Sequence, residues 1–106
     1  MQAKKKIEKR RYKRKKCFIS ISLSARDRVF TNYVSDISTG GMFIETDEGV
    51  EEGQIISIKF LSPYKLKGLQ SIIARVARCE SKGIAVSFKD IGEDQTETIE
   101  IFMDNL

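Results

Sequence analysis

The sequence has no histidine and no tryptophan, and only two cysteines and one proline among its 106 residues. The lack of histidine removes the commonest acid–base group and, with so few cysteines, nearly all zinc sites. Cys17 and Cys79 lie far apart and outside any Cys-x-x-Cys pair. We expect buried thiols in a reducing compartment, with a Cys17–Cys79 bridge as the alternative. We find no catalytic constellation and expect that the protein is not an enzyme.

Long apolar runs are missing as well. No stretch approaches the ~20 apolar residues of a membrane span, and no hydrophobic segment follows the basic N-terminus. We therefore predict no transmembrane segment, no secretory signal and a cytoplasmic location. The acidic loop from Asp47 to Gly53 lacks the ligand spacing of a known calcium loop, so we predict no metal site.

The net charge of +4 is unevenly distributed along the chain. The segment from Lys4 to Lys16 carries ten of the 19 Lys and Arg and one of the 15 acidic residues, which leaves nine basic and fourteen acidic residues elsewhere. Residues 1–16 contain little that could be buried, so we predict a flexible basic arm. Such an arm is a solvated charge run, a nucleic-acid or anionic-membrane arm, or a shaped anion site. Its three arginines, Arg10, Arg11 and Arg14, favour the last, because a guanidinium group contacts two acceptors at once.

From Cys17 onward the sequence predicts strands. Apolar and polar residues alternate from Cys17 to Ser24, as in a half-buried strand. Further strands are expected at about 28–36, 42–46, 54–61, 68–80 and 84–89. Six short strands without intervening helices indicate an antiparallel barrel or sandwich over residues 17–91.

The end of the chain predicts a helix within residues 92–106. Apolar residues recur at helical spacing, namely Ile99, Phe102, Met103 and Leu106. Asp94 or Thr96 is expected to cap the helix, and its acidic first turn suits the helix dipole. We expect the apolar face to pack on the barrel, with binding to a partner as the alternative.

Between the second and third strands lies the sequence Asp36-Ile37-Ser38-Thr39-Gly40-Gly41. Short polar side chains beside paired glycines predict a tight turn. The same residues also offer a carboxylate, two hydroxyls and backbone that a ligand can approach closely.

Arg10-Arg11-Tyr12-Lys13-Arg14 fits the pattern R-x-x-x-R, and Asp36 to Gly41 fits [D/N]-x-S-x-x-G. With the late strand Gly83-Ile84-Ala85-Val86-Ser87-Phe88, the whole chain resembles the PilZ domain, the bacterial receptor module for cyclic di-GMP. The resemblance implies a single domain with a mainly β fold: a six-stranded antiparallel barrel of split-barrel type with a C-terminal α-helix.

The resemblance also implies roles for individual residues. Arg10 approaches the O6 and N7 acceptors of a guanine, and Arg14 shares the guanine and phosphate contacts. Asp36 accepts from the N1–H and N2–H₂ donors of guanine, which adenine does not offer. Ser38 bonds to the ligand or fixes the turn, and Gly41 lets the base approach the backbone.

Three further residues complete the predicted ligand site. Arg11 lies inside the first motif. Lys9 stands where a basic residue favours a stacked ligand dimer. The ammonium group of a lysine, however, neither stacks on a base nor donates to two acceptors in one plane. Arg78 stands where relatives place a group that stacks on guanine, and the alternative is an exposed strand residue paired with an acid.

The leading hypothesis is therefore a cyclic di-GMP receptor without other cofactor, in which the ligand orders the arm against the barrel. A downstream protein effector then recognises the new surface, and no DNA or RNA is expected as a partner. The alternatives are a small barrel that binds nucleic acid or an anionic membrane, and a PilZ-like protein that acts only through protein contacts.

Overall fold

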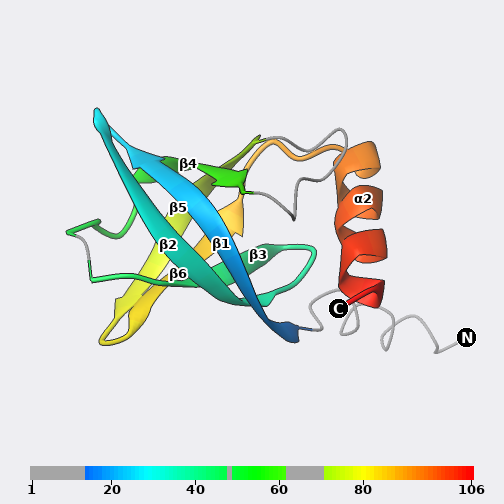
Figure 1. Cartoon of the computed structure of the whole chain (residues 1–106). Coiled ribbons are helices and arrows are strands. Elements are labelled where there is room, and N and C mark those ends of the chain that lie inside the picture. The colour runs from blue at the N-terminus through cyan, green and yellow to red at the C-terminus, as the bar shows by residue number, and fades with distance from the viewer. Residues whose placement is uncertain (1–13, 48, 62–70) are drawn as a thin grey trace, which may run out of the picture.

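The computed structural model describes residues 14–47, 49–61 and 71–106. Its elements are β1 (Lys15–Ala25), β2 (Arg28–Ile37), β3 (Gly41–Glu45), β4 (Ile55–Phe60), β5 (Ser71–Glu80), β6 (Gly83–Phe88) and α2 (Glu93–Asp104). The strands form a closed antiparallel barrel in the order β1-β2-β3-β6-β5-β4, and the helix lies at one end of it (Figure 1). The predicted fold class is confirmed.

The alternation in the sequence produces the barrel interior. In β1, the side chains of Ile19, Ile21 and Leu23 are at most 1% exposed, and the residues between them face outward. In β4, Ile56, Ile58 and Phe60 are buried in the same way. Because side chains alternate across a strand, each strand contributes one apolar row to a shared core.

Two glycines allow β3 and β6 to pair closely. A Cβ on Gly41 would overlap the carbonyl oxygen of Val86, and a Cβ on Gly83 would overlap that of Ile44. Gly41 pairs with Ser87 at one end of the ladder, and Gly83 pairs with Glu45 at the other. Both glycines are therefore required by the packing of one strand pair.

The helix covers the barrel with a short apolar face. Ile99 and Met103 are buried, and the ring of Phe102 lies 6.1 Å from the ring of Phe60. The predicted packing is thus observed for these residues. Leu106 follows the helix and is exposed, so its predicted place on the apolar face is wrong.

The predicted helix cap is also wrong. The N-cap is Gly92, whose N–H donates to the side chain of Gln95 at 3.0 Å. Asp94 lies inside the first turn, and Thr96 donates to the carbonyl of Gly92 at 3.1 Å. The helix lies within the predicted residues 92–106, but its N-cap is a glycine whose N–H is held by Gln95, in place of a side-chain cap.

Three further observations concern boundaries and thiols. β1 begins at Lys15, because Lys15 and Lys16 pair with the end of β2. The cysteines are free; Cys17 is half-buried, but Cys79 is exposed, so its predicted burial is wrong. Lys15 and Lys16 were predicted in the flexible arm, so that boundary is wrong; residues 1–13 of the arm and the start of the fifth strand at residue 68 lie outside the described residues.

Candidate functional site

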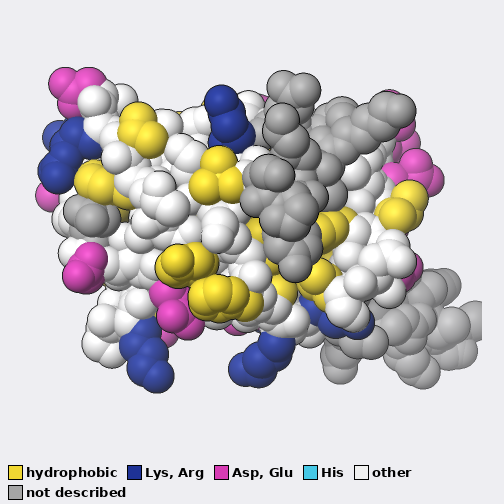
Figure 2. Space-filling model, in the orientation of Figure 1, with side chains coloured by type: hydrophobic (Ala, Val, Ile, Leu, Met, Phe, Trp, Pro, Cys, Tyr) yellow, Lys and Arg dark blue, Asp and Glu magenta, His cyan; other side chains and the backbone are white. Residues whose placement is uncertain are grey.

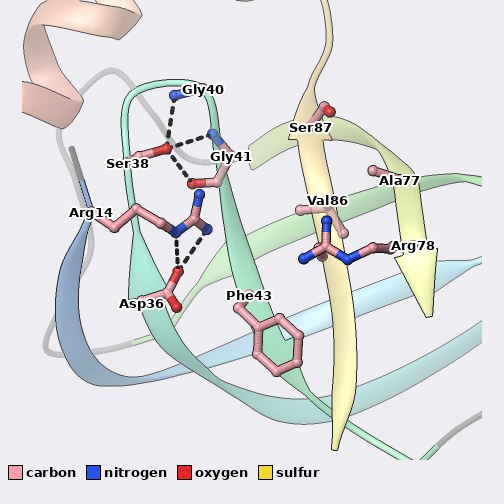
Figure 3. A pocket seen from close by; sticks show the side chains of 11 residues that line it. Arg14, Asp36, Ser38, Gly40, Gly41, Phe43, Ala77, Arg78, Val86 and Ser87 are labelled. Atoms are coloured by element: carbon pink, nitrogen blue, oxygen red, sulfur yellow. Dashed lines mark hydrogen bonds and ion pairs between the residues drawn. The ribbon is translucent and has the colours of Figure 1, made fainter. Parts of the chain in front are cut away.

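A hollow of about 340 Å³ lies where the first and second predicted motifs meet on the barrel (Figure 3). It is lined by one charged group before β1, one on β2 and one on β5, and by residues of β3 and β6 between them. We call this hollow the candidate site. Its lining residues are Arg14, Asp36, Ser38, Gly40, Gly41, Phe43, Ala77, Arg78, Ala85, Val86 and Ser87.

Five of the eight predicted ligand-binding residues line the candidate site. They are Arg14, Asp36, Ser38, Gly41 and Arg78. The strand pairing brings them together, because β1 runs antiparallel to β2 and β6 lies between β3 and β5. The other three, Lys9, Arg10 and Arg11, lie outside the described residues.

Arg14 and Asp36 form an ion pair across the β1–β2 ladder. The Nε of Arg14 donates to Oδ1 of Asp36 at 2.7 Å, and its Nη2 lies 2.6 Å from the same oxygen. The two side chains are 46% and 27% exposed, so water and ligands can reach both. The pair directly links one arginine of the first motif to the carboxylate of the second.

Ser38 holds the turn after β2. Its side chain is buried, and its Oγ accepts from the N–H groups of Gly40 and Gly41 at 3.2 Å each. The same hydroxyl donates to the carbonyl of Gly41 at 3.3 Å. Of the two predicted roles for Ser38, the geometry favours fixing the turn, because its hydroxyl is engaged by backbone groups.

Gly41 has a structural role that was not predicted. Its missing side chain makes room for the carbonyl of Val86. Phe88 N–H donates to the carbonyl of Gly40 at 2.9 Å and fixes the turn to β6. The paired glycines therefore hold the floor of the hollow in place, and ligand contact by Gly41 is not needed to explain its presence.

Arg78 is an exposed strand residue paired with an acid, as one of its two predicted alternatives has it, and it also lines the hollow. Its Nε donates to Glu80 Oε2 at 2.7 Å, and its side chain is 60% exposed. The same guanidinium extends from β5 across β6 toward the hollow (Figure 3). A flat, exposed cation at the rim of a hollow can stack on a planar ring.

The predicted ligand-binding residues leave out six residues of the lining, namely Gly40, Phe43, Ala77, Ala85, Val86 and Ser87. Phe43 pairs with Asp36 on one side and with Ala85 on the other, and its ring is half-buried in the hollow. A signal was present, because Met42 and Ile44 are inward-facing and Phe43 must then point outward beside Asp36. The ring gives the hollow an apolar wall between charged groups.

A thiol lies beside the charged pair. Cys17 Sγ donates to the carbonyl of Val34 at 3.6 Å. Burial of the thiol, with a smaller contribution from the negative charge of Asp36, raises the pKa of Cys17 to about 11. The thiol is therefore protonated at neutral pH, and it is a poor nucleophile.

A second hollow of about 240 Å³ lies at the other end of the β1–β2 ribbon. We call it the hairpin hollow; its lining includes Arg26, Asp27, Arg28, Phe30 and Gly49. Among the described residues we find no group of His, Cys, Asp and Glu arranged to hold a metal ion. The helix in the described part of the chain is not long and apolar enough to cross a membrane.

Comparison with known proteins gives a family. The family model described as the PilZ domain matches residues 8–104. No curated protein sequence matches the chain significantly.

Solved structures share the fold at low sequence identity. The PilZ domain of CeSA from a cellulose-synthesizing bacterium is 14% identical, with a TM-score of 0.67 over 88% of this chain and 96% of that one. The Bacillus subtilis inhibitor of motility MotI/DgrA is 14% identical, with a TM-score of 0.69 over 91% of this chain and 49% of that one. An uncharacterized Legionella protein is 17% identical, with a TM-score of 0.56 over 89% and 92%.

Proposed function

The chain belongs to the PilZ domain family, a family of cyclic di-GMP receptor modules, and we propose that it binds cyclic di-GMP in the candidate site. The observation that carries the proposal is the meeting of both motifs in one hollow. Arg14 and Asp36 are 22 positions apart in the sequence, yet they lie in hydrogen-bond contact. Arg78 approaches the same hollow from β5.

The side chains offer complementary chemistry to a guanine dinucleotide. The carboxylate of Asp36 matches the paired N1–H and N2–H₂ donors of guanine. The guanidinium of Arg14 matches either the O6 and N7 acceptors or a phosphate. Arg78 and Phe43 provide flat groups on which a base can rest.

A guanine that binds Asp36 must first replace the ion pair between Arg14 and Asp36. In this structure, Asp36 accepts from Arg14 at 2.7 Å. A guanine that takes over this carboxylate releases the guanidinium, which then becomes available to a ligand acceptor. Because both groups are partly exposed, the exchange leaves no buried charge without a partner.

We propose that the basic arm supplies contacts beyond this hollow. At about 340 Å³ the hollow is at the lower end of ligand sites, so it holds part of the dinucleotide. We propose that Lys9, Arg10 and Arg11 contact the remainder, chiefly its phosphates, and that this contact orders the arm beside Arg14. A downstream protein then recognises the ordered arm and barrel together.

The test is calorimetric titration of cyclic di-GMP, with cyclic di-AMP as the ligand control. We expect Asp36→Ala and Arg14→Ala each to weaken binding about 10- to 100-fold, as expected for loss of a charged hydrogen bond. Arg10→Ala tests the arm in the same way. The matched controls are Asp27→Ala and Arg28→Ala in the hairpin hollow, which should bind as wild type does.

Repeating the titration at high salt separates this proposal from loose phosphate binding. A nucleic-acid or membrane arm loses affinity steeply with added salt, because counterion release dominates. A shaped site that recognises guanine retains its preference for cyclic di-GMP over cyclic di-AMP at every salt concentration. Equal binding of both dinucleotides, or loss of binding in the hairpin-hollow controls, would contradict the proposal.

A further inference from the structure

Register shifts interrupt three ladders of the described barrel, and all three adjoin the candidate site. They lie between Lys16 and Ile19 in β1–β2, between Val34 and Asp36 in β2–β3, and between Val76 and Arg78 in β5–β6. The described parts of the β1–β4, β3–β6 and β4–β5 ladders are regular. Such a shift is a β-bulge, in which one strand carries an extra residue. The bulges therefore occur where the hollow is built.

In β5, the bulge changes which side chains point inward. The inward row of this strand ends with Ala74 and Val76, which are at most 1% exposed. Strict alternation would place the side chain of Arg78 in the same buried row. Instead, that side chain is 60% exposed, because Ala77 and Arg78 together lie opposite Ala85. Ala77 is therefore the extra residue that turns Arg78 outward.

β2 shows the same change on the other side of the hollow. Asn32 and Val34 are buried, so strict alternation would bury Asp36 as well. Ile37 is buried in its place, and the side chain of Asp36 is 27% exposed. The alternation changes at Ser35, which is the extra residue opposite β3. The carboxylate of β2 and the guanidinium of β5 thus both reach the hollow through a bulge in their own strand.

Without the two bulges, this sequence would place two charged side chains in the core. None of the buried residues in the described ranges is charged. Figure 2 shows Lys, Arg, Asp and Glu side chains at the surface of the molecule. An unpaired charge in an apolar interior is strongly unfavourable, whereas an extra residue disrupts the ladder only locally. The bulges therefore make charged residues at these two positions compatible with the barrel.

The bulges also bring the outward side chains into one row across four strands. Asp36 pairs with Phe43, Phe43 with Ala85, and Ala85 with Arg78. Neighbouring strands lie about 4.8 Å apart, so the row is about 14 Å long. One end of the row accepts hydrogen bonds, its centre is apolar, and its other end carries a flat cation.

We propose that Ala77 is a positioning residue of the ligand site, because the bulge at Ala77 directs the guanidinium of Arg78 at the ligand. Both residues line the hollow although they are adjacent in the sequence (Figure 3). In a regular strand, adjacent side chains point to opposite faces. This proposal rests on the binding of cyclic di-GMP proposed above, and it identifies a backbone feature on which that binding depends.

The test is a rescue experiment with cyclic di-GMP, followed by calorimetric titration. Arg78→Ala should weaken binding about tenfold. Because position 77 faces the same hollow, adding Ala77→Arg to this variant should recover about threefold or more of the loss. Adjacent positions of a regular strand would not both serve the ligand, since one of them would face the core. Thermal unfolding of each variant shows that it is folded.

The matched control is Ser71→Arg in the same Arg78→Ala background. Ser71 is exposed on β5, and it lies about 23 Å along the strand from Arg78, so the added charge is far from the hollow. This control should bind as Arg78→Ala alone does.

The outcomes separate this proposal from the proposed function. Recovery by Ala77→Arg and not by Ser71→Arg supports the positioning role. If the wild type binds but the two double variants have equal affinity, or if Arg78→Ala binds as the wild type does, the positioning role alone is overturned. A wild-type protein that does not bind cyclic di-GMP overturns the proposed function and this inference together.

Discussion

The candidate site and the hairpin hollow contain similar side chains but are built differently. Each has an arginine, an aspartate, a phenylalanine and a glycine, and each has a cysteine thiol nearby. The candidate site takes its lining from five strands and their ends, whereas the hairpin hollow takes its lining from one hairpin and the loop between β3 and β4. Residue types alone therefore do not distinguish a ligand site from a surface depression.

The two hollows also differ in their turns. Around the candidate site, the Ser38 turn is bonded internally and to β6. At the hairpin hollow, the turn contains Arg26 at a φ of 61°, a left-handed conformation that is unfavourable for a residue other than glycine. Preorganised groups bind a ligand with less loss of entropy, so the bonded Ser38 turn suits the candidate site to ligand binding.

The largest expected effect is on stability, from the two glycines. Gly41→Ala should lower the free energy of unfolding by about 3 kcal/mol, because its Cβ overlaps the carbonyl of Val86. Gly49→Ala in the hairpin hollow meets nothing within 4 Å and should change stability by less than about 0.5 kcal/mol. Urea denaturation of both variants measures the contrast, and equal losses would refute it.

An intermediate effect is expected from the arginines. Arg78→Ala should weaken the binding of cyclic di-GMP about tenfold, because the base loses a stacking partner. Its ion pair with Glu80 is largely exposed, so the melting temperature should barely change. Arg28→Ala removes a guanidinium that lies 4.9 Å from the ring of Phe30 and should leave ligand affinity unchanged. If Arg28→Ala weakens binding as much as Arg78→Ala, the assignment of the hollow is wrong.

The smallest effect concerns the thiols. The alkylation rate of Cys17 should keep rising with pH beyond 9.0, toward a pKa of about 11. Asp36→Asn removes a negative charge and should lower this pKa, while leaving it above 9.0 because burial is the larger cause. Mass spectrometry of the alkylated protein across pH measures both. Asp27→Asn, in the hairpin hollow, should not change the rate profile of Cys17.

The sequence was sufficient for the fold because its strands are strongly patterned. Ile19, Ile21 and Leu23 alternate with polar residues, and all three are buried in the barrel. The helix start was less predictable. Asp94 and Thr96 are good caps by residue type, yet the N-cap is Gly92, whose N–H donates to the side chain of Gln95. Competing caps differ by little free energy, so local preference does not select between them.

The site was only partly predictable for a different reason. Sequence motifs name Arg14 and Asp36, but their direct ion pair depends on the β1–β2 register. The role of Gly41 depends on the approach of Val86, which is 45 positions later in the chain. The outward position of Phe43 was predictable from alternation alone. The place of Ser87 beside Gly41 depends on the β3–β6 pairing. The contacts that the motifs do not specify are therefore set by long-range strand pairing and not by residue type.

The closed strand order limits how a partner can recognise this domain. β1 pairs with both β2 and β4, so each described strand has a neighbour on either side along part of its length. Where a strand is paired on both sides, an extended peptide cannot add itself as a further strand, which is a common mode of recognition by open sheets. The first half of β2 is paired with β1 alone, because its pairing with β3 begins at Tyr33. A partner that adds a strand must therefore use such a partly paired stretch, and any other partner must recognise side chains on the barrel wall, the helix or the segments outside the barrel.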